Sequence, residues 1–158
     1  MTDKTYVISG FSGIGKSTAT ENIDNVIDFE SSGYSHFPDG SVNPEFPNNY
    51  VVALDLEMQK NPNNIYLVSC HKEVRELLHT RGIQFILVFP YRDQRNNYMI
   101  RWLKRGSSQK FITSMYNRWD DMITSCENDA APQIRLDEGQ YLEHILPQKF
   151  FKYFSENY

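Results

Sequence analysis

The segment best suited to chemistry lies near the start of the chain. Residues 10–17 read GFSGIGKS, which fits the pattern G-x-x-x-x-G-K-[S/T] of a phosphate-binding loop (P-loop), and a threonine follows. Glycines let successive backbone amides turn toward phosphate oxygens, a lysine bridges the β- and γ-phosphates, and a hydroxyl binds Mg²⁺. A chance match at four fixed positions is expected in well under about 1% of chains of this length. The predicted contacts to ATP are Gly10, Ser12, Gly13, Ile14, Gly15, Lys16, Ser17 and Thr18, with Ser17 also on Mg²⁺.

Two carboxylates follow the second apolar run of the chain. Motor and switch NTPases usually carry an apolar strand that ends in an aspartate near Mg²⁺, and here only the run VID, ending at Asp28, does so. Asp28 and Glu30 are two residues apart, so both point to the same side of a strand. We expect Asp28 to accept a proton from an acceptor hydroxyl or to hold Mg²⁺ through water, and Glu30 to order the acceptor. A solvated strand end is the alternative.

A block of basic residues lies in the middle of the chain. Residues 61–118 carry ten lysines and arginines against three acids, whereas the flanking segments 1–60 and 119–158 have net charges of −6 and −5. Arginine suits the charge that spreads over a transferring phosphoryl group. Arg101 and Arg105 lie four residues apart, on one face of a helix, and are the candidate catalytic arginines. A solubilising helix face is the alternative. The neighbouring basic residues are Arg92, Arg95 and Lys104.

Apolar runs alternate with amphipathic segments, which predicts one α/β domain over residues 1–158 with a mainly parallel sheet. The expected strands are 5–10, 25–30, 65–70, 83–89 and 133–137. The expected helices are 16–22, 47–60, 71–81, two helices within 92–127 that break at 106–108, and 139–151. We expect the two tryptophans to lie in the core and the FFKYF segment at 150–154 to pack there or to dock at the C-terminus.

Composition narrows the class of protein. The chain has 158 residues, 40% of them hydrophobic, which is enough for a packed core. No apolar run reaches the roughly 18–20 residues of a membrane span, and the N-terminus lacks the plan of a signal peptide. With two cysteines, a cytoplasmic protein without a membrane partner is expected, in the host cytoplasm if it is viral. The net charge of −4 argues against a nucleic-acid partner without excluding it.

The order of these parts resembles the nucleoside monophosphate kinase-like branch of the P-loop kinases, and within it the small deoxynucleoside monophosphate or adenylate kinase-like proteins of bacteriophages. The matching segments are GFSGIGKST, VIDFESS, YMIRWLKRG and IRLDEGQYLEHIL. The resemblance implies a three-layer P-loop NTPase fold, a five-stranded parallel sheet of order 2-3-1-4-5 and a helical lid over about 91–118. It further implies that Lys16 and Ser17 serve ATP and Mg²⁺, that Arg101 stacks near adenine or clamps phosphates, and that Arg105 reaches the transferred group.

The acceptor side departs from that family. The third strand ends in Ser69-Cys70-His71, where ordinary adenylate kinases have Asp-Gly-x-Pro-Arg. By the resemblance, the excursion at about 34–60 occupies the acceptor position. His71 follows a strand end, where it would face the acceptor, cap a helix or be a satisfied polar residue. Cys70 is expected as a small buried hydrophobe. Within the excursion, aromatic rings would stack on a base and asparagines would bind its edge, although simple packing is the alternative. These residues are Tyr34, His36, Phe37, Phe46 and Tyr50, with Asn43, Asn48 and Asn49.

We therefore expect an ATP-dependent, Mg²⁺-dependent kinase that phosphorylates a small acceptor, with a (deoxy)nucleoside monophosphate as the first candidate. A nucleoside, a small metabolite or a modified DNA base is an alternative acceptor. A nucleotide-binding regulatory protein without an acceptor is an alternative of another class. The sequence leaves open whether the protein is a monomer or a homodimer.

Overall fold

Five short runs of mostly apolar residues pair into one parallel sheet in the computed structural model, which describes residues 5–146. The sheet order is β2-β3-β1-β4-β5, and each neighbouring pair runs parallel, which confirms the α/β class and the expected strand order. Strands β3 and β4 are buried along their whole length, as the middle of such a sheet requires. The strands are β1 (Tyr6–Gly10), β2 (Val26–Asp28), β3 (Ile65–Ser69), β4 (Ile86–Pro90) and β5 (Gln133–Leu136).

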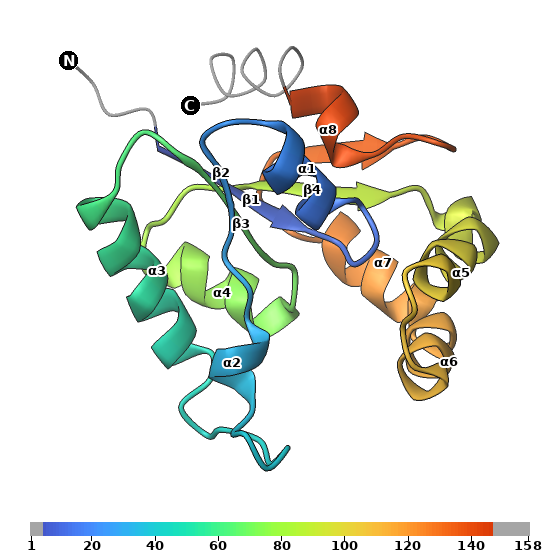
Figure 1. The fold of residues 1–158 in the computed structure, drawn as a ribbon, viewed down its shortest axis with the longest axis horizontal. Helices are drawn as coiled ribbons and strands as arrows, with labels where there is room; N and C mark the ends of the chain where they lie inside the picture. Colours follow the sequence, from blue (N-terminus) through green and yellow to red (C-terminus); the bar gives the residue numbers. More distant parts are fainter. Residues whose placement is uncertain (1–4, 147–158) are drawn as a thin grey trace.

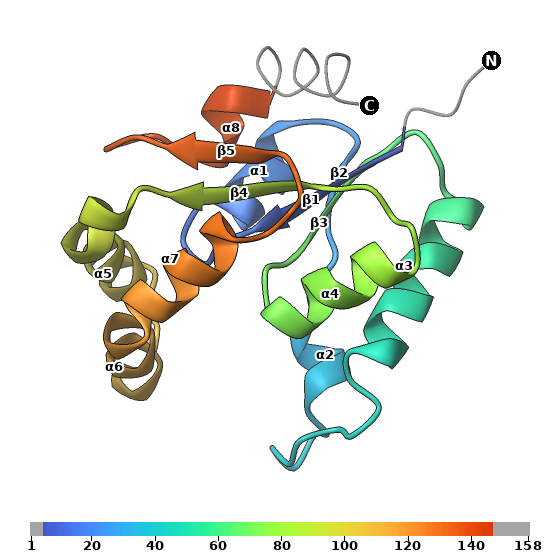
Figure 2. The same cartoon turned by 180° about the vertical axis from the view of Figure 1, so that it is seen from behind.

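Helices cover both faces of the sheet. Figures 1 and 2 show α1 and α8 on one face and α3, α4 and α7 on the other. Since all strands are parallel, their carboxyl ends share one edge, and this edge holds Gly10, Asp28 and Ser69. The described helices are α1 (Lys16–Asn22), α2 (Ser32–Ser35), α3 (Asn48–Lys60), α4 (Lys72–Thr80), the 3₁₀ helix η1 (Arg92–Gln94), α5 (Arg95–Lys104), α6 (Gln109–Asn117), α7 (Trp119–Glu127) and α8 (Leu142–Ile145).

Two expected boundaries are wrong, and hydrogen bonding explains both. The strand expected over 83–89 begins only at Ile86, where pairing with β1 starts, and includes Pro90, whose carbonyl accepts from Arg135. The segment 92–127 forms three α-helices rather than two, because a second break falls at Arg118 between α6 and α7. This break turns Trp119 into the core, where its Nε1 donates to a backbone carbonyl at 2.8 Å.

Two helices, α2 and α8, also differ from the expectation. The short helix α2 was not expected, and it follows β2 after only three residues. The helix expected over 139–151 begins later, at Leu142, because Gly139 adopts a φ of 76° in a preceding turn. Positions beyond residue 146, including the FFKYF segment, lie outside the described residues.

Aromatic side chains pack between the glycine-rich loop (residues 10–15) and helices α5 and α7. Phe11, Tyr98, Trp102 and Trp119 are each 1% exposed or less, which confirms the tryptophans as core residues. The rings of Phe11 and Trp119 meet edge-to-face with centroids 5.4 Å apart. Trp102 also donates from Nε1 to the carbonyl of Ser12 at 3.2 Å. The core therefore holds the glycine-rich loop directly.

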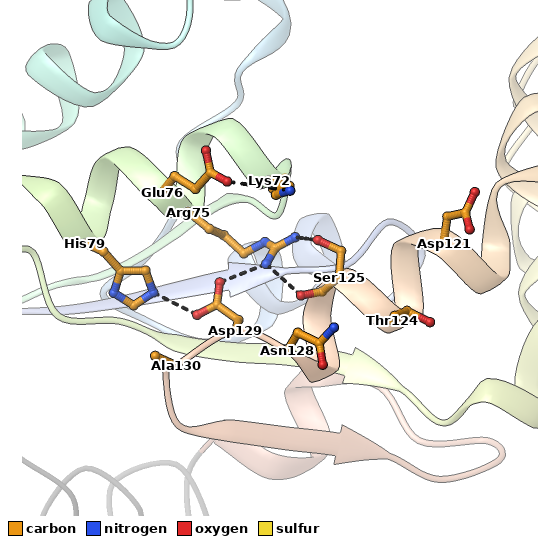
Figure 3. A pocket seen from close by; sticks show the side chains of 10 residues that line it. All are labelled: Lys72, Arg75, Glu76, His79, Asp121, Thr124, Ser125, Asn128, Asp129 and Ala130. Carbon is orange, nitrogen blue, oxygen red and sulfur yellow. Dashed lines mark hydrogen bonds and ion pairs between the residues drawn. The ribbon is translucent and has the colours of Figure 1, made fainter.

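A buried ion pair joins α4 to the end of α7 (Figure 3). Arg75 and Asp129 lie 2.8 Å apart with side chains 4% and 6% exposed. The guanidinium also donates to the carbonyl of Cys70 and to Oγ of Ser125, at 2.9 and 2.7 Å. Burial opposes ionisation of Asp129, but bonds from a backbone amide, His79 and Arg75 outweigh it and lower its pKa. The group lines a cavity of about 460 Å³ that includes no residue of the glycine-rich loop.

Replacing Arg75 with methionine is expected to destabilise the fold by about 3–5 kcal/mol, because the buried Asp129 would lose its guanidinium partner and keep only His79 and the amide of Ala131. Urea unfolding followed by circular dichroism measures this loss. Arg81→Met is the matched control, since Arg81 pairs with Asp55 at an exposed site and such pairs contribute about 0–1 kcal/mol. Equal stability of the two variants would contradict the structural role given to Arg75.

Candidate functional site

The glycine-rich loop connects β1 to α1 and keeps several backbone amides unpaired. Gly13 and Gly15 both have φ of 95°, a left-handed conformation that side chains disfavour. A Cβ on Gly15 would also lie 3.0 Å from the Tyr141 ring. Lys16 Nζ curls back to the carbonyl of Gly10 at 2.9 Å. Among the described residues, the amides of Gly13, Gly15, Lys16 and Ser17 have no hydrogen-bond acceptor. The loop therefore presents donors and a lysine of the kind that bind phosphate oxygens.

Ser17 and Thr18 complete the loop at the first turn of α1. Both residues are exposed, and neither hydroxyl donates to a described residue. Ile14 anchors the loop to the rest of the protein. Its side chain is fully buried, and its carbonyl accepts a hydrogen bond from the amide of Leu142 at 2.8 Å. The hydroxyl of Ser17 is therefore available to a metal ion, as the motif predicts.

Arg101 supports the glycine-rich loop. Its Nη1 donates to the carbonyl of Gly13 at 3.0 Å and its Nη2 to the carbonyl of Gln140 at 2.7 Å. The guanidinium lies between the rings of Tyr98 and Tyr141, 4.3 and 3.9 Å from their centroids. Arg101, which was expected in a lid, thus binds the backbone of the glycine-rich loop. Its contact with the Tyr141 ring was not predicted from the sequence.

Arg105 stands at the rim of the same loop. It is exposed, its Nη2 donates to Oγ of Ser12 at 2.8 Å, and its Nε donates to Oγ of Ser107 at 3.0 Å. Desolvation lowers its pKa, while the nearby charge of Glu30 opposes this shift. Within the described part of the chain, no carboxylate forms an ion pair with Arg105. Its charge is therefore free to act on an anion over the loop.

Asp28 lies within electrostatic reach of the loop lysine. It is half-buried at the end of β2, and this burial raises its pKa above the ordinary aspartate value. The charge of Lys16 opposes the increase, and the charge of Glu30 adds to it. Glu30 itself is exposed, with Oε1 accepting from the amide of Ser31 at 3.1 Å. Asp28 thus lies within electrostatic reach of Lys16 and Glu30, and Glu30 lies within electrostatic reach of Arg105.

Tyr50 differs from its expected role. It is fully buried, so it has no surface for an acceptor. Its hydroxyl donates to the carbonyl of Phe29 and accepts from the amide of Ser69 at 3.3 Å, which ties the end of β2 to the end of β3. Burial raises its pKa well above the ordinary tyrosine value, so it stays protonated. Tyr50 therefore positions the backbone at the carboxyl ends of β2 and β3.

The other residues of the excursion divide into packed and exposed groups. Tyr34 stacks on Phe29 with centroids 5.7 Å apart, and Phe46 packs against the buried Tyr50. Phe37 is 46% exposed, and His36 is exposed with Nδ1 at 2.8 Å from Oγ of Ser35. The asparagines mostly serve the local backbone: Asn43 accepts from the amide of Glu45, and Asn49 donates to the carbonyl of Tyr34. Asn48 is exposed.

His71 and Cys70 follow β3 at the same edge. The His71 ring bonds through Nδ1 to Oγ of Ser69 and meets Phe46 edge-on. Desolvation lowers its pKa, Glu73 opposes this, and the charge of Lys16 reinforces it. Cys70 is half-buried, whereas the sequence predicted a buried hydrophobe. A hydrogen bond from the Cys126 thiol lowers the pKa of Cys70 against the effect of desolvation.

In comparisons with known proteins, no protein-family model matches the chain and no curated protein is similar to it. Within residues 5–146, no helix is long and apolar enough to cross a membrane. In the same range, no three histidine, cysteine, aspartate or glutamate side chains group together as ligands for a metal.

Proposed function

We propose that this protein is an ATP-dependent phosphotransferase that moves the γ-phosphoryl group of ATP to an oxygen of a small acceptor. The observation that carries the proposal is the position of Asp28, a half-buried carboxylate within electrostatic reach of Lys16 and beside a loop of unpaired amides. A site with a phosphate-binding loop on one side and a basic carboxylate on the other has the two halves that phosphoryl transfer needs.

The glycine-rich loop would hold the triphosphate of ATP. Its unpaired amides and Lys16 would bind phosphate oxygens, as in a P-loop NTPase. The exposed hydroxyl of Ser17 fits Mg²⁺, and Asp28 would reach the metal through a water molecule. When bound, Mg·ATP supplies the activated phosphoryl group. Arg105 would then stabilise the charge of that group during transfer, since it bonds to the loop and has no ion-pair partner there.

On the acceptor side, Asp28 would orient the acceptor oxygen and accept its proton. The raised pKa brings this carboxylate closer to the range of an effective general base. A nucleotide-binding regulatory protein would need neither this carboxylate nor the exposed arginine, so their convergence favours the enzyme. A (deoxy)nucleoside monophosphate is the acceptor that the family resemblance suggests, and a nucleoside, small metabolite or modified DNA base is the other class.

The experiment that tests this proposal is ADP release from Mg·ATP in the presence of common nucleoside monophosphates, nucleosides and small hydroxy compounds. We expect at least one acceptor to stimulate ADP release more than tenfold over the rate without acceptor. A variant lacking the loop lysine serves as the blank. Tight ATP binding with no stimulation by any acceptor would favour the regulatory alternative instead.

A further inference from the structure

The arginines of the described chain divide into two groups by their partners. Outside residues 95–118, each arginine pairs with a carboxylate at 2.6–3.3 Å, and these are Arg75, Arg81, Arg92 and Arg135. Residues 95–118, here named the α5–α6 hairpin, hold four further arginines and two lysines but no aspartate or glutamate. None of these six cations forms an ion pair with a described carboxylate. The hairpin therefore has a charge of +6, whereas the rest of the chain, with ten basic and twenty acidic residues, has a net charge of −10.

Neutral groups hold the arginines of this hairpin in place. Arg95 donates from Nε and Nη2 to the carbonyl of Tyr116 at 3.0 and 2.6 Å. Arg118 donates from Nε to Oγ of Ser114 at 3.2 Å, and the other two arginines also bond to carbonyl and hydroxyl oxygens. These oxygens fix a guanidinium without cancelling its charge, so the hairpin keeps its positive charge for an anion from outside.

One side of α6 carries part of this charge outward. Lys110, Ser114 and Arg118 are spaced by four residues, which places them in a row on one helix face. Thr113 and Asn117 lie beside that row, and all five residues are exposed. These five residues are here named the α6 face. Its two cations are eight residues apart, which corresponds to about 12 Å along a helix.

The α6 face matches the backbone of a nucleic acid in spacing and in chemistry. A length of about 12 Å spans three or four phosphates of one strand, at about 3.4 Å for each phosphate. Lysine and arginine, together with the hydroxyls and amides of serine, threonine and asparagine, make most protein contacts to phosphates. An anionic membrane would also attract the cations, but membrane-surface helices bury an apolar face. The α6 face has only polar side chains, so a strand fits it better.

Both ends of the α6 face border the candidate site. Figures 1 and 2 show α5 and α6 side by side beyond the carboxyl end of β4. Next to Lys110, the ring of Phe111 lies 5.5 Å from Cζ of Arg105, which bonds to the glycine-rich loop. At the other end, the charge of Arg118 acts on His71, which follows β3. A strand on this face would therefore run beside the carboxyl edge of the sheet.

We propose that the α6 face binds the sugar-phosphate backbone of a nucleic-acid strand. Bound ATP does not account for this surface, because no side chain of the α6 face bonds to the glycine-rich loop in the described part of the chain. The docking itself does not rest on the proposed function. One consequence does rest on it: among the acceptors above, a strand docked here favours the modified DNA base.

The test measures binding of a 12-nucleotide DNA strand and of an RNA strand of the same sequence, each with a fluorophore and no terminal phosphate. Fluorescence anisotropy follows their binding to the full chain, saturated with Mg²⁺ and a non-hydrolysable ATP analogue. We expect a Kd of about 1–100 μM at physiological salt for at least one strand. The logarithm of the binding constant should fall against the logarithm of the salt concentration with a slope of about −2 to −3, as three or four phosphate contacts require. Absence of binding by both strands would overturn the proposal.

A pair of double variants ties this binding to the α6 face. Lys110→Gln with Arg118→Gln should weaken binding about tenfold or more at 0.1 M salt and make the slope shallower by about 1.4, because two phosphate contacts are lost. Lys60→Gln with Arg81→Gln is the matched control, since it removes the same charge at exposed positions outside the hairpin. This control should stay within twofold of the wild type. Equal losses in the two double variants would mean that net charge alone attracts the strand, which would overturn the proposal.

Thr113→Glu gives a second variant that removes no hydrogen bond of a described residue. It places a carboxylate between the two cations at an exposed position, and it should also weaken binding about fivefold or more. Thermal unfolding by circular dichroism should show wild-type stability for this variant. A folded Thr113→Glu chain that binds the strand as tightly as the wild type would contradict the docking surface.

The docking surface and the proposed function fail in different ways. Lys16→Ala should lose phosphoryl transfer but bind the strand within twofold of the wild type. Strand binding that disappears in Lys16→Ala, yet survives in the α6 double variant, would place the strand on the glycine-rich loop and overturn the docking surface. Tighter binding to vesicles of phosphatidylcholine with 30% phosphatidylserine, or to polyglutamate, would overturn it as well. If the strand binds as expected but no acceptor is phosphorylated, only the proposed function fails.

Discussion

Lys16→Ala is expected to lower acceptor-dependent phosphoryl transfer by about 10²–10³-fold or more, the loss usually seen when a key electrostatic donor to the transition state is removed. Lys16 is the first residue of α1, directly after the glycine-rich loop, and its Nζ already lies at the carboxyl edge, 2.9 Å from the carbonyl of Gly10. No other cation of the described residues bonds to that carbonyl, so none stands ready to replace it.

The fold should survive this change. Lys16 is only partly buried and forms no ion pair with a described carboxylate, so its truncation leaves no buried charge behind. Thermal unfolding by circular dichroism should therefore stay within a few degrees of the wild type. Lys60→Ala, at the exposed end of α3, is the matched control and should keep both stability and turnover. Wild-type turnover in Lys16→Ala would refute the assignment of the loop.

Asp28→Asn is expected to lower transfer by about 10²–10⁴-fold, the range of a lost general base, and at the same time to stabilise the fold. Burial raises the pKa of Asp28 in the folded state, and the charge of Glu30 adds to this. Folding therefore favours the protonated form, so the carboxylate destabilises the fold at any pH above its folded pKa. The amide removes this cost at neutral pH.

The sign of the effect can be checked by pH. The stability gained by Asp28→Asn should be largest at pH 7 and should shrink toward zero as pH falls below 3.8, the ordinary pKa of aspartate, where both states of the wild type are protonated. Urea unfolding at a series of pH values measures it. Asp24→Asn, at an exposed position before β2, should change neither stability nor turnover. A destabilised Asp28→Asn with full activity would mean that Asp28 is a structural residue.

Local sequence patterns predicted most of the strands and helices. Runs such as IYLVS at β3 and ILVFP at β4 are continuous and apolar because both faces of a central parallel strand are covered. The strand order came from the family resemblance, since pairing joins strands far apart along the chain. The break at Arg118 was missed because its cause is tertiary: it lets Trp119 reach a carbonyl 27 residues away.

The site was predictable in part. Lys16 and Asp28 each end or follow a parallel strand, so their meeting at the carboxyl edge follows from topology. The role of Arg101 was not predictable, because its partners lie 88 and 39 residues away on the loop and before α8. The burial of Tyr50 was also not predictable. An aromatic residue beside an expected binding loop has the same sequence pattern whether its ring contacts a ligand or packs in the core.

The most direct test of the proposed phosphotransferase follows the γ-phosphoryl group itself. The full chain is incubated with γ-labelled Mg·ATP and a panel of hydroxyl acceptors, and the label is traced by chromatography and mass spectrometry. The proposed mechanism predicts an acceptor that gains one phosphoryl group in a ratio of one to one with the ADP released, and a loss of that product in Lys16→Ala. Label that appears only as inorganic phosphate, at a rate no acceptor changes, would contradict it.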